Sequence, residues 1–381
     1  MERIGIGVIG TGFIGPAHIE ALRRLPQVEV LALAEAGDQV AAEKSAALGV
    51  DTPYGDYHDL IQDERIDSVH VCSPNHLHYE MVKATLAAGK HVVCEKPLAL
   101  TVSEADELVE LAQEKGLVNA VNFNIRFYPL MQQLRSMVSR GDLGTILAIQ
   151  GSYLQDWLFH ATDYNWRLEP EQSGQSRAVA DIGSHWMDLI EHVTGRQMTE
   201  VMADLATFHK VRKKPLVPVE TYAGKVLKPE DYQDIRINTE DYATVMSRLD
   251  NEGRCVMTVN QVAAGRKNRL SFEIQGSKQS VAWDSEKPNQ LWIGQRDGNN
   301  ETLLRDPSLC YPECRPWIDY PGGHNEGFPD TFKQMMKAIY GYIAGGCMGE
   351  TPFPTFADGR RELLLCERIL ESHAKRAWTT V

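Results

Sequence analysis

Short apolar runs of strand type alternate with helix-type spacing of apolar residues through the first third of the chain. Side chains of a strand repeat every two residues and those of a helix about every 3.6, so the two patterns can be told apart. The predicted strands are 4–9, 28–34, 68–72, 91–94 and 117–122, and the predicted helices between them end near residues 25, 48, 88 and 115. This alternation is typical of the α/β class, with a doubly wound parallel sheet that binds ligands beyond the carboxyl ends of its strands.

The pattern changes after residue 123. A helix over 129–139 leads to a strand over 145–153, and further strands then follow one another with few helices between them. These strands are 201–207, 242–249, 254–262, 270–275, 280–283 and 290–293, and two helices, 326–344 and 357–375, close the chain. Consecutive strands without crossover helices indicate a mostly antiparallel sheet, hence an α+β arrangement. We therefore predict two domains, 1–123 and 124–381.

The polar, proline-bearing stretch 210–237 interrupts the strand pattern of the second domain. We predict an inserted loop there. Its basic run, Lys210, Arg212, Lys213 and Lys214, is expected to be a solvated face, with substrate binding as the alternative.

Composition narrows the class of protein. A chain of 381 residues exceeds the usual size of one hydrophobic core, which agrees with two domains. A formal net charge of -13 argues against nucleic acid and against an anionic membrane as partners. No apolar run reaches the roughly 20 residues of a spanning helix, and a first strand beginning at about Arg3 leaves no room for a signal peptide. A cytoplasmic protein is expected.

The cysteines do not indicate a disulfide framework, because the chain has seven of them, an odd number. Cys310 and Cys314 are close in sequence, but no second pair at metal-binding spacing accompanies them. We expect free thiols and no metal.

A glycine-rich turn, Gly10-Thr11-Gly12-Phe13-Ile14-Gly15, follows the first strand and opens the first helix. In that context Gly10 permits the tight turn, Gly12 lets a pyrophosphate approach the backbone, and Gly15 lets the helix pack on the strand. Amides at the start of the helix favour the anion. The pattern predicts a dinucleotide bordered by Phe13 and Ile14, against the alternative of a turn without a ligand.

Glu35 ends the second strand, about 20 residues beyond the glycine turn. A carboxylate in this position accepts hydrogen bonds from ribose hydroxyls and repels a 2′-phosphate. No cation follows until Lys44, so NAD is predicted in preference to NADP. The alternatives are a capping role for Glu35 and a ribose contact from Asp38 instead.

Polar residues follow the next two strands. Ser73, Asn75 and His78 come after the third, where they are expected to border the nicotinamide ribose. The fourth strand ends in Glu95-Lys96-Pro97, which places a carboxylate and an amine at the ligand edge of the sheet, with a proline that can adopt a cis bond. His76 and His78 could suggest a metal, but polar groups at a helix start explain them equally well.

A second chemically dense segment begins at Asp181 in the second domain. Asp181 and His185 are four residues apart and would share one face of a helix. A carboxylate beside an imidazole suits a general base. Asp188 and His192 continue that face, so a metal site competes with this interpretation, as does helix capping.

Three motifs in order resemble the Gfo/Idh/MocA family (glucose–fructose oxidoreductase / inositol dehydrogenase): Gly10–Gly15, Glu95-Lys96-Pro97 and Asp181-Ile182-Gly183-Ser184-His185. The resemblance implies a Rossmann domain followed by an α+β domain whose open antiparallel sheet often forms a subunit interface, in a homodimer or homotetramer. It also implies oxidation or reduction of one secondary alcohol of a sugar or cyclitol with NAD or NADP.

Carried onto this chain, the resemblance assigns catalytic roles to Lys96, Asp181 and His185. His185 would remove the hydroxyl proton, Asp181 would orient the reacting groups, and Lys96 would stabilise the alkoxide. The segment entering the second domain would turn Asn124 and Arg126 toward the cleft, for cofactor and substrate respectively. Residues 1–123 would bind NAD, and 124–381 would bind substrate and form the oligomer.

A narrower likeness is to members that oxidise a ring hydroxyl of an anhydrosugar or, at C3, of a glycoside. It rests on the segments that carry Tyr153, Gln155, Trp157, Trp166 and Arg167, which are expected to line a sugar pocket. His324 is assigned to the same pocket, with helix capping by Asn325 as the alternative interpretation of its segment. Aromatic faces suit the apolar face of a pyranose, although plain core packing would also explain the two tryptophans. The alternatives are an inositol-type dehydrogenase, a hydrolase or epimerase that recycles NAD in place, and a non-catalytic NAD-binding sensor.

Overall fold

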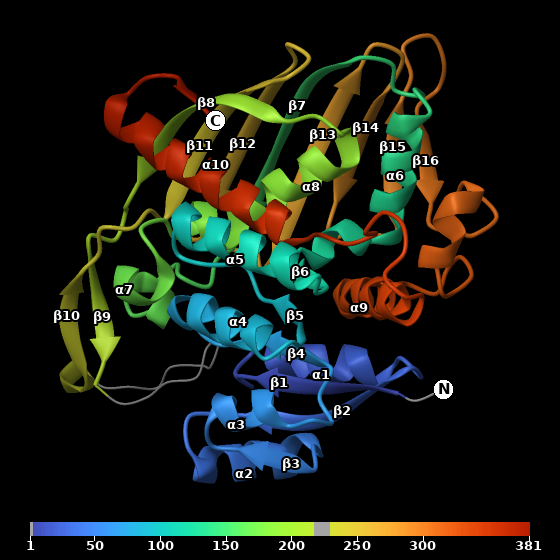
Figure 1. Cartoon of the computed structure of the whole chain (residues 1–381). Helices are drawn as coiled ribbons and strands as arrows, with labels where there is room; N and C mark the ends of the chain where they lie inside the picture. Colours follow the sequence, from blue (N-terminus) through green and yellow to red (C-terminus); the bar gives the residue numbers. More distant parts are fainter. Residues whose placement is uncertain (1–2, 217–228) are drawn as a thin grey trace. The chain divides into compact units, whose positions relative to one another are not determined.

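The computed structural model describes residues 3–216 and 229–381 and separates them into two compact units. One unit comprises Met1–Phe127 with Phe328–Leu363, and the other Tyr128–Gly327 with Leu364–Val381. This differs from a division between residues 123 and 124, because helix α9 (Phe328–Ala344) packs on α1 (Gly15–Arg23) in the first unit. Figure 1 shows the course of the chain in colour.

The first unit contains a six-stranded sheet in the order β3-β2-β1-β4-β5-β6, with every neighbouring pair parallel. Its strands are β1 (Ile4–Ile9), β2 (Val28–Ala34), β3 (Thr52–Tyr54), β4 (Ser68–Val71), β5 (His91–Cys94) and β6 (Asn119–Val121). The predicted doubly wound Rossmann sheet is confirmed. The strand order reverses between β1 and β4, which places the ligand crevice outside the carboxyl ends of these strands.

Helices connect these strands in the predicted alternation. They are α1, α2 (Asp38–Leu48), α3 (Tyr57–Gln62), α4 (His78–Ala87), preceded by the turn η1 (Asn75–Leu77), and α5 (Val102–Lys115). Local sequence explains α5 well, since Thr101 and Glu104 form a capping box at its start and Gly116 ends it in the left-handed region. Both β3 and α3 lie where only a loop was expected, because such short elements carry little periodicity.

The core of the first unit lies on the parallel sheet. Its buried residues include Val69, Val71 and Val92 of the central strands, with Phe356 and Leu363 from the first turns of α10 (Phe356–Lys375). A parallel sheet is covered on both faces, which explains why its strands are continuous apolar runs. Helix α10 therefore completes a core that begins at the other end of the chain.

The second unit is built on a nine-stranded sheet in the order β16-β15-β14-β13-β7-β12-β11-β8-β17. Its strands are β7 (Ile146–Leu154), β8 (Met198–Ala206), β11 (Tyr242–Leu249), β12 (Arg254–Asn260), β13 (Arg269–Gly276), β14 (Ser280–Asp284), β15 (Gln290–Gly294), β16 (Glu301–Leu304) and β17 (Thr379–Thr380). Neighbouring strands are antiparallel except for the parallel pair β7 and β12. The predicted mostly antiparallel sheet is confirmed.

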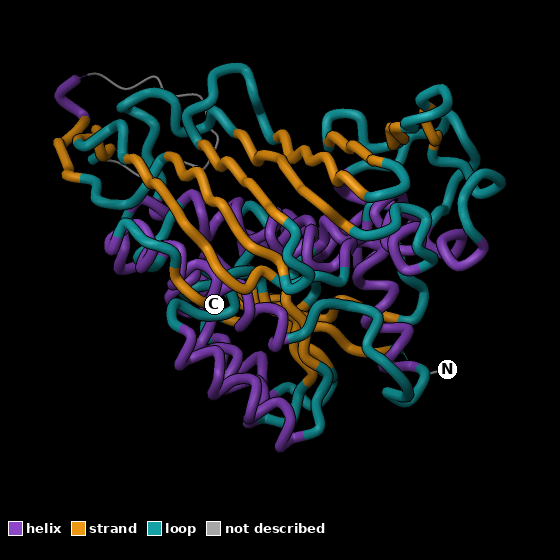
Figure 2. Tube along the Cα trace, turned by 90° about the horizontal axis from the view of Figure 1, so that it is seen from above, coloured by secondary structure: helices purple, strands orange, loops and turns teal. Residues whose placement is uncertain are grey.

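The two faces of this sheet differ in polarity. Along β13, Leu270, Phe272 and Ile274 are buried, whereas the residues between them are half-exposed. Helices α6 (Pro129–Ser139) and α8 (Ser184–Thr194) pack together, and α8 also contacts β7 on the buried face. Figure 2 looks onto the opposite face of this sheet, and no helix covers the strands in that view.

The inserted segment forms a hairpin. Strands β9 (Val211–Pro215) and β10 (Tyr232–Arg236) pair antiparallel. Val211 lies opposite Arg236 at one end of the pair, and Pro215 lies opposite Tyr232 at the other. The prediction of a loop over 210–237 is therefore wrong at these strands, while 217–228 lie outside the described residues. The prediction that the basic run 210–214 is a solvated face is also wrong at Arg212, whose side chain is fully buried.

Short helices complete the second unit: α7 (Pro170–Ser173), η3 (Trp166–Leu168), η4 (Val179–Gly183), η5 (Pro229–Asp231) and η6 (Pro312–Trp317), whereas η2 (Asn124–Phe127) belongs to the first unit. Among the residues described, no helix combines the length and the apolar character needed to cross a membrane.

Candidate active site

The glycine turn has the geometry of a phosphate-binding loop. Gly10 has φ 85°, and a Cβ there would lie 2.9 Å from the backbone of Cys72. A Cβ at Gly15 would lie 2.2 Å from the Gly10 carbonyl oxygen, so only glycine fits both positions. A Cβ at Gly12 would meet no described atom within 4 Å. The backbone is thus tight where the helix packs and open where a pyrophosphate would approach.

The exposed Phe13 and the half-buried Ile14 complete this turn, and Ile14 is the N-cap residue of α1. No side chain caps the helix there, and Pro16 occupies its first turn. The amides of the first turn therefore face the loop and supply the positive end of the helix dipole to an anion.

Glu35 lies against the glycine turn. Its Oε1 atom accepts hydrogen bonds from the Thr11 backbone N, at 2.5 Å, and from Thr11 Oγ1, at 2.6 Å. This contact holds the carboxylate at the loop, where the ribose of a dinucleotide is read. Asp38 instead lies exposed in the first turn of α2, close to Gly55. The geometry favours Glu35 for the ribose contact.

Glu35→Ala is expected to lower the ratio of kcat/KM for NAD to kcat/KM for NADP about tenfold, because a charge-assisted hydrogen bond and the repulsion of a 2′-phosphate are both lost. Initial rates with each cofactor measure the ratio. Asp38→Ala is the matched control and should leave it unchanged. A change in the ratio for Asp38→Ala alone would transfer the ribose contact to Asp38.

Glu95 is a buried carboxylate at the end of β5, directly before the half-exposed Lys96, and the Lys96–Pro97 bond is cis. His18 Nε2 lies 2.9 Å from Glu95 Oε1, Asn122 Nδ2 donates to the same oxygen, and the Lys96 amide donates to Oε2 at 3.2 Å. Burial raises the pKa of Glu95, but the hydrogen bonds and the neighbouring positive charges outweigh it and lower the pKa to about 2. Glu95 is therefore an anion beside Lys96.

A chain of buried hydrogen bonds extends from this carboxylate into the first unit. His18 Nδ1 lies 2.7 Å from His70 Nδ1, His70 Nε2 lies 2.6 Å from the Tyr340 hydroxyl, and that hydroxyl lies 3.0 Å from Ser68 Oγ. Burial keeps the pKa of His70 well below its usual value, so His70 is neutral. His18 Nε2 donates to Glu95, because an ionised carboxylate can only accept. The chain ties Glu95 to helix α9.

Acid is expected to remove the stability that Glu95 contributes. Its folded pKa of about 2 lies below the ordinary value of 4.5, so the contribution is complete above about pH 5 and is lost as the pH falls toward 2. The shift corresponds to about 3 kcal/mol. Urea unfolding of Glu95→Gln between pH 6 and pH 3 should show a flatter acid limb than the unchanged chain, with the exposed Glu43→Gln as control. Equal acid limbs in Glu95→Gln and the unchanged chain would contradict this account.

The ends of β4 and β6 present polar groups beside Glu95. Ser73 Oγ and Asn122 Oδ1 are buried and have no hydrogen-bond partner among the described residues. Asn75 is half-buried in the turn that follows β4. Hydroxyl and amide groups of this kind suit the ribose and carboxamide of a nicotinamide nucleotide, so the residues present fit NAD.

His78 contacts the backbone of two neighbouring loops. Its ring is fully buried, with Nδ1 2.7 Å from the Pro97 carbonyl oxygen and Nε2 2.9 Å from that of Ser73. Burial lowers the pKa of His78, although the two carbonyls favour the charged ring. A ring enclosed between two backbone carbonyls joins the loop after β4 to the loop after β5, and cofactor contact by His78 stays a prediction.

Asn124 and Arg126 make contacts inside the first unit. The buried Asn124 donates through Nδ2 to Thr331 Oγ1 of α9 at 2.7 Å. Arg126 Nη2 donates to Asp358 Oδ1 of α10 at 2.7 Å. Burial raises the pKa of Asp358, and the charge of Arg126 outweighs this and lowers it. These contacts attach the end of the Rossmann sheet to the carboxyl-terminal helices, so cofactor contact by Asn124 and substrate contact by Arg126 stay predictions.

The second unit carries Asp181 and His185 at a change of helix type. Asp181 lies in a π-helical turn, Val179–Gly183, and His185 in the first turn of α8. Turns of this type are rare and frequently lie at functional sites. Within this unit, Gln261 Nε2 donates to Asp181 Oδ2 at 2.8 Å, and Arg167 Nε lies 3.5 Å from Oδ1. The His185 ring lies 6.4 Å, centre to centre, from the ring of Tyr153.

The predicted sugar residues fall into two groups. Trp166 and Arg167 belong with Asp181, since the Arg167 guanidinium also stacks on the Trp166 ring at 4.4 Å. Gln155 and Trp157 belong together, because Trp157 Nε1 donates to Gln155 Oε1 at 2.8 Å. Gln155 Nε2 in turn donates to Asn268 at 2.8 Å, so this amide orients the indole.

Trp157 also packs on a small apolar cluster formed by Leu158, Leu168 and Ile237. His324 lies in the loop that precedes α9. Its ring is exposed, and the contact the structure shows for it is a 3.4 Å approach to Gly322 of its own turn. Helix α9 begins at Phe328, so Asn325 is not its cap.

No group of three or more His, Cys, Asp or Glu side chains in the described parts of the chain is arranged to hold a metal ion. Cys310 and Cys314 are buried thiols, and Cys314 Sγ lies 3.3 Å from Ser136 Oγ.

The fold and the two sets of residues define a nucleotide-dependent oxidoreductase with a Rossmann domain and an α+β domain. Residues 4–123 match the family model described as "Oxidoreductase family, NAD-binding Rossmann fold", and residues 131–282 match the "GFO/IDH/MocA C-terminal domain". The chain belongs to the Gfo/Idh/MocA family of oxidoreductases, and its cofactor is NAD.

Relatives match along nearly the whole chain. Levoglucosan dehydrogenase of Pseudarthrobacter phenanthrenivorans is 30% identical, with 100% of this chain and 99% of that protein covered. Myo-inositol 2-dehydrogenase of Thermotoga maritima is 33% identical, with 94% and 93% covered. A solved structure of levoglucosan dehydrogenase in complex with NADH and L-sorbose superposes with a TM-score of 0.89 at 29% identity, covering 100% and 99%.

Several residues that support the site were not identified from the sequence. The Gln261 amide donates a hydrogen bond to Asp181, and Arg177 Nη1 donates to Gln261 Oε1 at 3.1 Å. His18 donates to Glu95. Gln261 and Arg177 lie in no recognisable motif. His18 is a helix residue just after the glycine turn, and Asn122 is the last residue of the predicted strand 117–122, so these two carried a weak signal.

Proposed function

We propose that this protein oxidises a secondary ring hydroxyl of a sugar, glycoside or anhydrosugar, at C3 in the glycosides, by hydride transfer to NAD. The observation that carries the proposal is the grouping in the second unit of Asp181 with Arg167 and Trp166, and of His185 with Tyr153. Aromatic faces for the ring and polar groups for its hydroxyls suit a carbohydrate. The levoglucosan dehydrogenase relative, matched end to end, supports the same substrate class.

Each catalytic residue has a chemical role in this proposal. His185 removes the proton of the substrate hydroxyl, and Asp181, oriented by Gln261, positions the reacting groups. Lys96, whose charge acts on the ionised Glu95, stabilises the developing alkoxide. NAD, when bound, accepts the hydride from the carbon that carries the hydroxyl.

The myo-inositol 2-dehydrogenase relative, at 33% identity, favours a cyclitol as the second candidate substrate class. A cyclitol presents the same secondary hydroxyls on an apolar ring face, so the same residues would read it. NAD-recycling hydrolysis or epimerisation is distinguished by cofactor that stays bound through purification.

Formation of NADH tests the function. The purified protein is assayed with NAD and with NADP against glucose, methyl and aryl glucosides, levoglucosan, myo-inositol and glucose 6-phosphate. We expect turnover with NAD on glycosides or anhydrosugars, and product analysis then identifies the carbon oxidised. Turnover confined to myo-inositol would establish the cyclitol candidate, and silence across the panel with NAD binding intact would overturn the dehydrogenase proposal.

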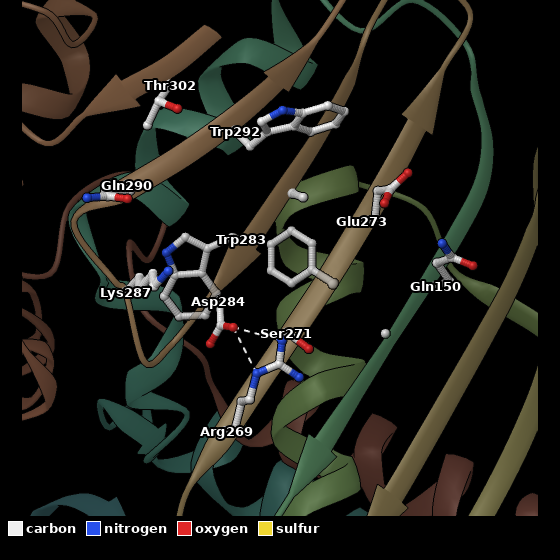
Figure 3. A pocket seen from close by; sticks show the side chains of 13 residues that line it. Gln150, Arg269, Ser271, Glu273, Trp283, Asp284, Lys287, Gln290, Trp292 and Thr302 are labelled. Carbon is white, nitrogen blue, oxygen red and sulfur yellow. Dashed lines mark hydrogen bonds and ion pairs between the residues drawn. The ribbon is translucent and has the colours of Figure 1, made fainter. Parts of the chain in front are cut away.

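We also propose that the open face of the nine-stranded sheet is a subunit interface of a homodimer or homotetramer. Apolar side chains are exposed on this face, among them Leu147, Val256, Trp292 and Leu304. A cavity of about 450 Å³ lies on it, lined by residues such as Gln150, Glu273 and Trp292 (Figure 3). Patches of this kind mark interaction sites.

Light scattering after size exclusion gives the mass in solution, and Trp292→Glu should reduce it toward that of one chain. A monomeric unchanged protein would refute the interface.

All seven cysteines are free thiols, which supports a reducing compartment such as the cytoplasm.

A further inference from the structure

Arg212 occupies an unusual position for a residue of a surface hairpin. Its neighbours on β9, Val211 and Lys213, are exposed, but its guanidinium is fully buried. Nη2 donates to Asp241 Oδ1 at 2.8 Å, and Nη1 donates to the carbonyl oxygens of His160 and Asp163 at 3.0 and 3.1 Å. One side chain thus joins the hairpin, the start of β11 and the segment between Trp157 and Arg167.

That segment, 157–167, carries three of the predicted sugar-binding residues, and the hairpin is attached to its backbone at several points. The Lys213 amide donates to the Ala161 carbonyl at 2.9 Å, and His209 Nε2 donates to the Phe159 carbonyl at 2.9 Å. Further along, Lys214 donates to Glu169, which also accepts from the Tyr164 hydroxyl. Four carbonyls of the segment, those of residues 159, 160, 161 and 163, are therefore paired by side chains and amides on β9 or just before it.

Asp241 links Arg212 to the catalytic carboxylate. Arg177, also buried, donates through Nη2 to Asp241 Oδ1 at 2.5 Å and through Nη1 to Gln261 Oε1 at 3.1 Å. Because the oxygen of the Gln261 amide is taken by Arg177, its NH₂ group must face Asp181, to which it donates at 2.8 Å. The Asp241 carboxylate is shared by two buried guanidinium groups, so it is the common anchor of both branches.

We propose that Arg212 is a positioning residue, through which the inserted hairpin holds segment 157–167 and the Asp181 carboxylate in one arrangement and so determines which sugar ring is accepted. This rests on the proposed function. Only arginine suits the position, because its planar fork reaches one carboxylate and two carbonyls at once, whereas a lysine ammonium at the end of a flexible stem reaches them poorly.

Arg212→Lys is the test variant, since it keeps the positive charge opposite Asp241. Lys213→Met is the matched control on the same strand, because its exposed ammonium pairs with Asp234 and its backbone bond to Ala161 is kept. We expect Arg212→Lys to raise KM for the substrate at least tenfold while the Kd for NAD changes less than twofold.

Gln261→Leu should instead lower kcat and displace the pH profile of kcat, because it releases Asp181 and leaves segment 157–167 in place.

Hydrogen exchange of the protein without substrate gives a readout independent of turnover. Amides of 157–167 should exchange at least tenfold faster in Arg212→Lys than in Lys213→Met, while amides of the first unit stay unchanged. If no substrate is found in the panel, the function fails, and this measurement alone decides whether Arg212 positions the segment. Unchanged exchange in Arg212→Lys would overturn the positioning role, and faster exchange with an unchanged KM would overturn the specificity role.

Discussion

His185→Ala is expected to lower kcat by about 10²–10⁴-fold, the usual contribution of a general base, with the affinity for NAD nearly unchanged. His185 lies in the first turn of α8 in the second unit, and the glycine turn and Glu35 lie in the first. Loss of the imidazole removes the group that takes the hydroxyl proton without altering the dinucleotide loop. Steady-state rates with the substrate found in the panel give kcat, and titration of intrinsic fluorescence gives the Kd for NAD.

His192→Ala, on the same helix but outside the proposed chemistry, serves as the control for His185→Ala. It should retain turnover within a few-fold. If His185→Ala lost less than about fivefold in kcat, the base would have to be another group. The pH profile of kcat for the variant would then show whether the ionisation of that other group persists.

Asp241→Ala is expected to reduce the free energy of unfolding by about 3–5 kcal/mol, the cost of leaving buried charges without their partner. Two guanidinium groups, those of Arg177 and Arg212, share this one carboxylate, and all three side chains are almost fully buried. Burial raises the pKa of Asp241, and the Arg177 charge with its hydrogen bonds outweighs this and lowers it, so the carboxylate is ionised. Urea unfolding at neutral pH measures the loss.

Asp234→Asn provides the control for Asp241→Ala, because Asp234 forms an exposed ion pair with Lys213. Exposed pairs contribute roughly 0–1 kcal/mol, so this variant should unfold almost as the unchanged chain does. A loss below about 1 kcal/mol in Asp241→Ala would mean that water or another acceptor replaces the carboxylate, and the anchor would then not lie at Asp241.

Most of the fold could be predicted from the sequence, since strands β2 and β11 and helix α6 begin and end at the residues expected. Their apolar residues recur at one period along the element, and that period is a local property. Elements that were missed, such as β3, α3 and β17, are short or packed mainly by distant partners. The pairing of α9 with α1 joins opposite ends of the chain, and no local pattern indicates it.

The same limit applies to the site. The glycine turn, Glu35 and the Glu95-Lys96-Pro97 sequence could be identified directly, because a cofactor loop needs particular residues at fixed spacing along one stretch of chain. The sequence by itself therefore determined the Rossmann sheet, the NAD-binding turn and the class of enzyme. Only the tertiary structure decided that Arg212 is buried and that Gln261 holds Asp181, because burial and hydrogen-bond partners depend on segments far apart in the chain. A basic run looks the same in sequence whether its guanidinium meets water or a buried carboxylate.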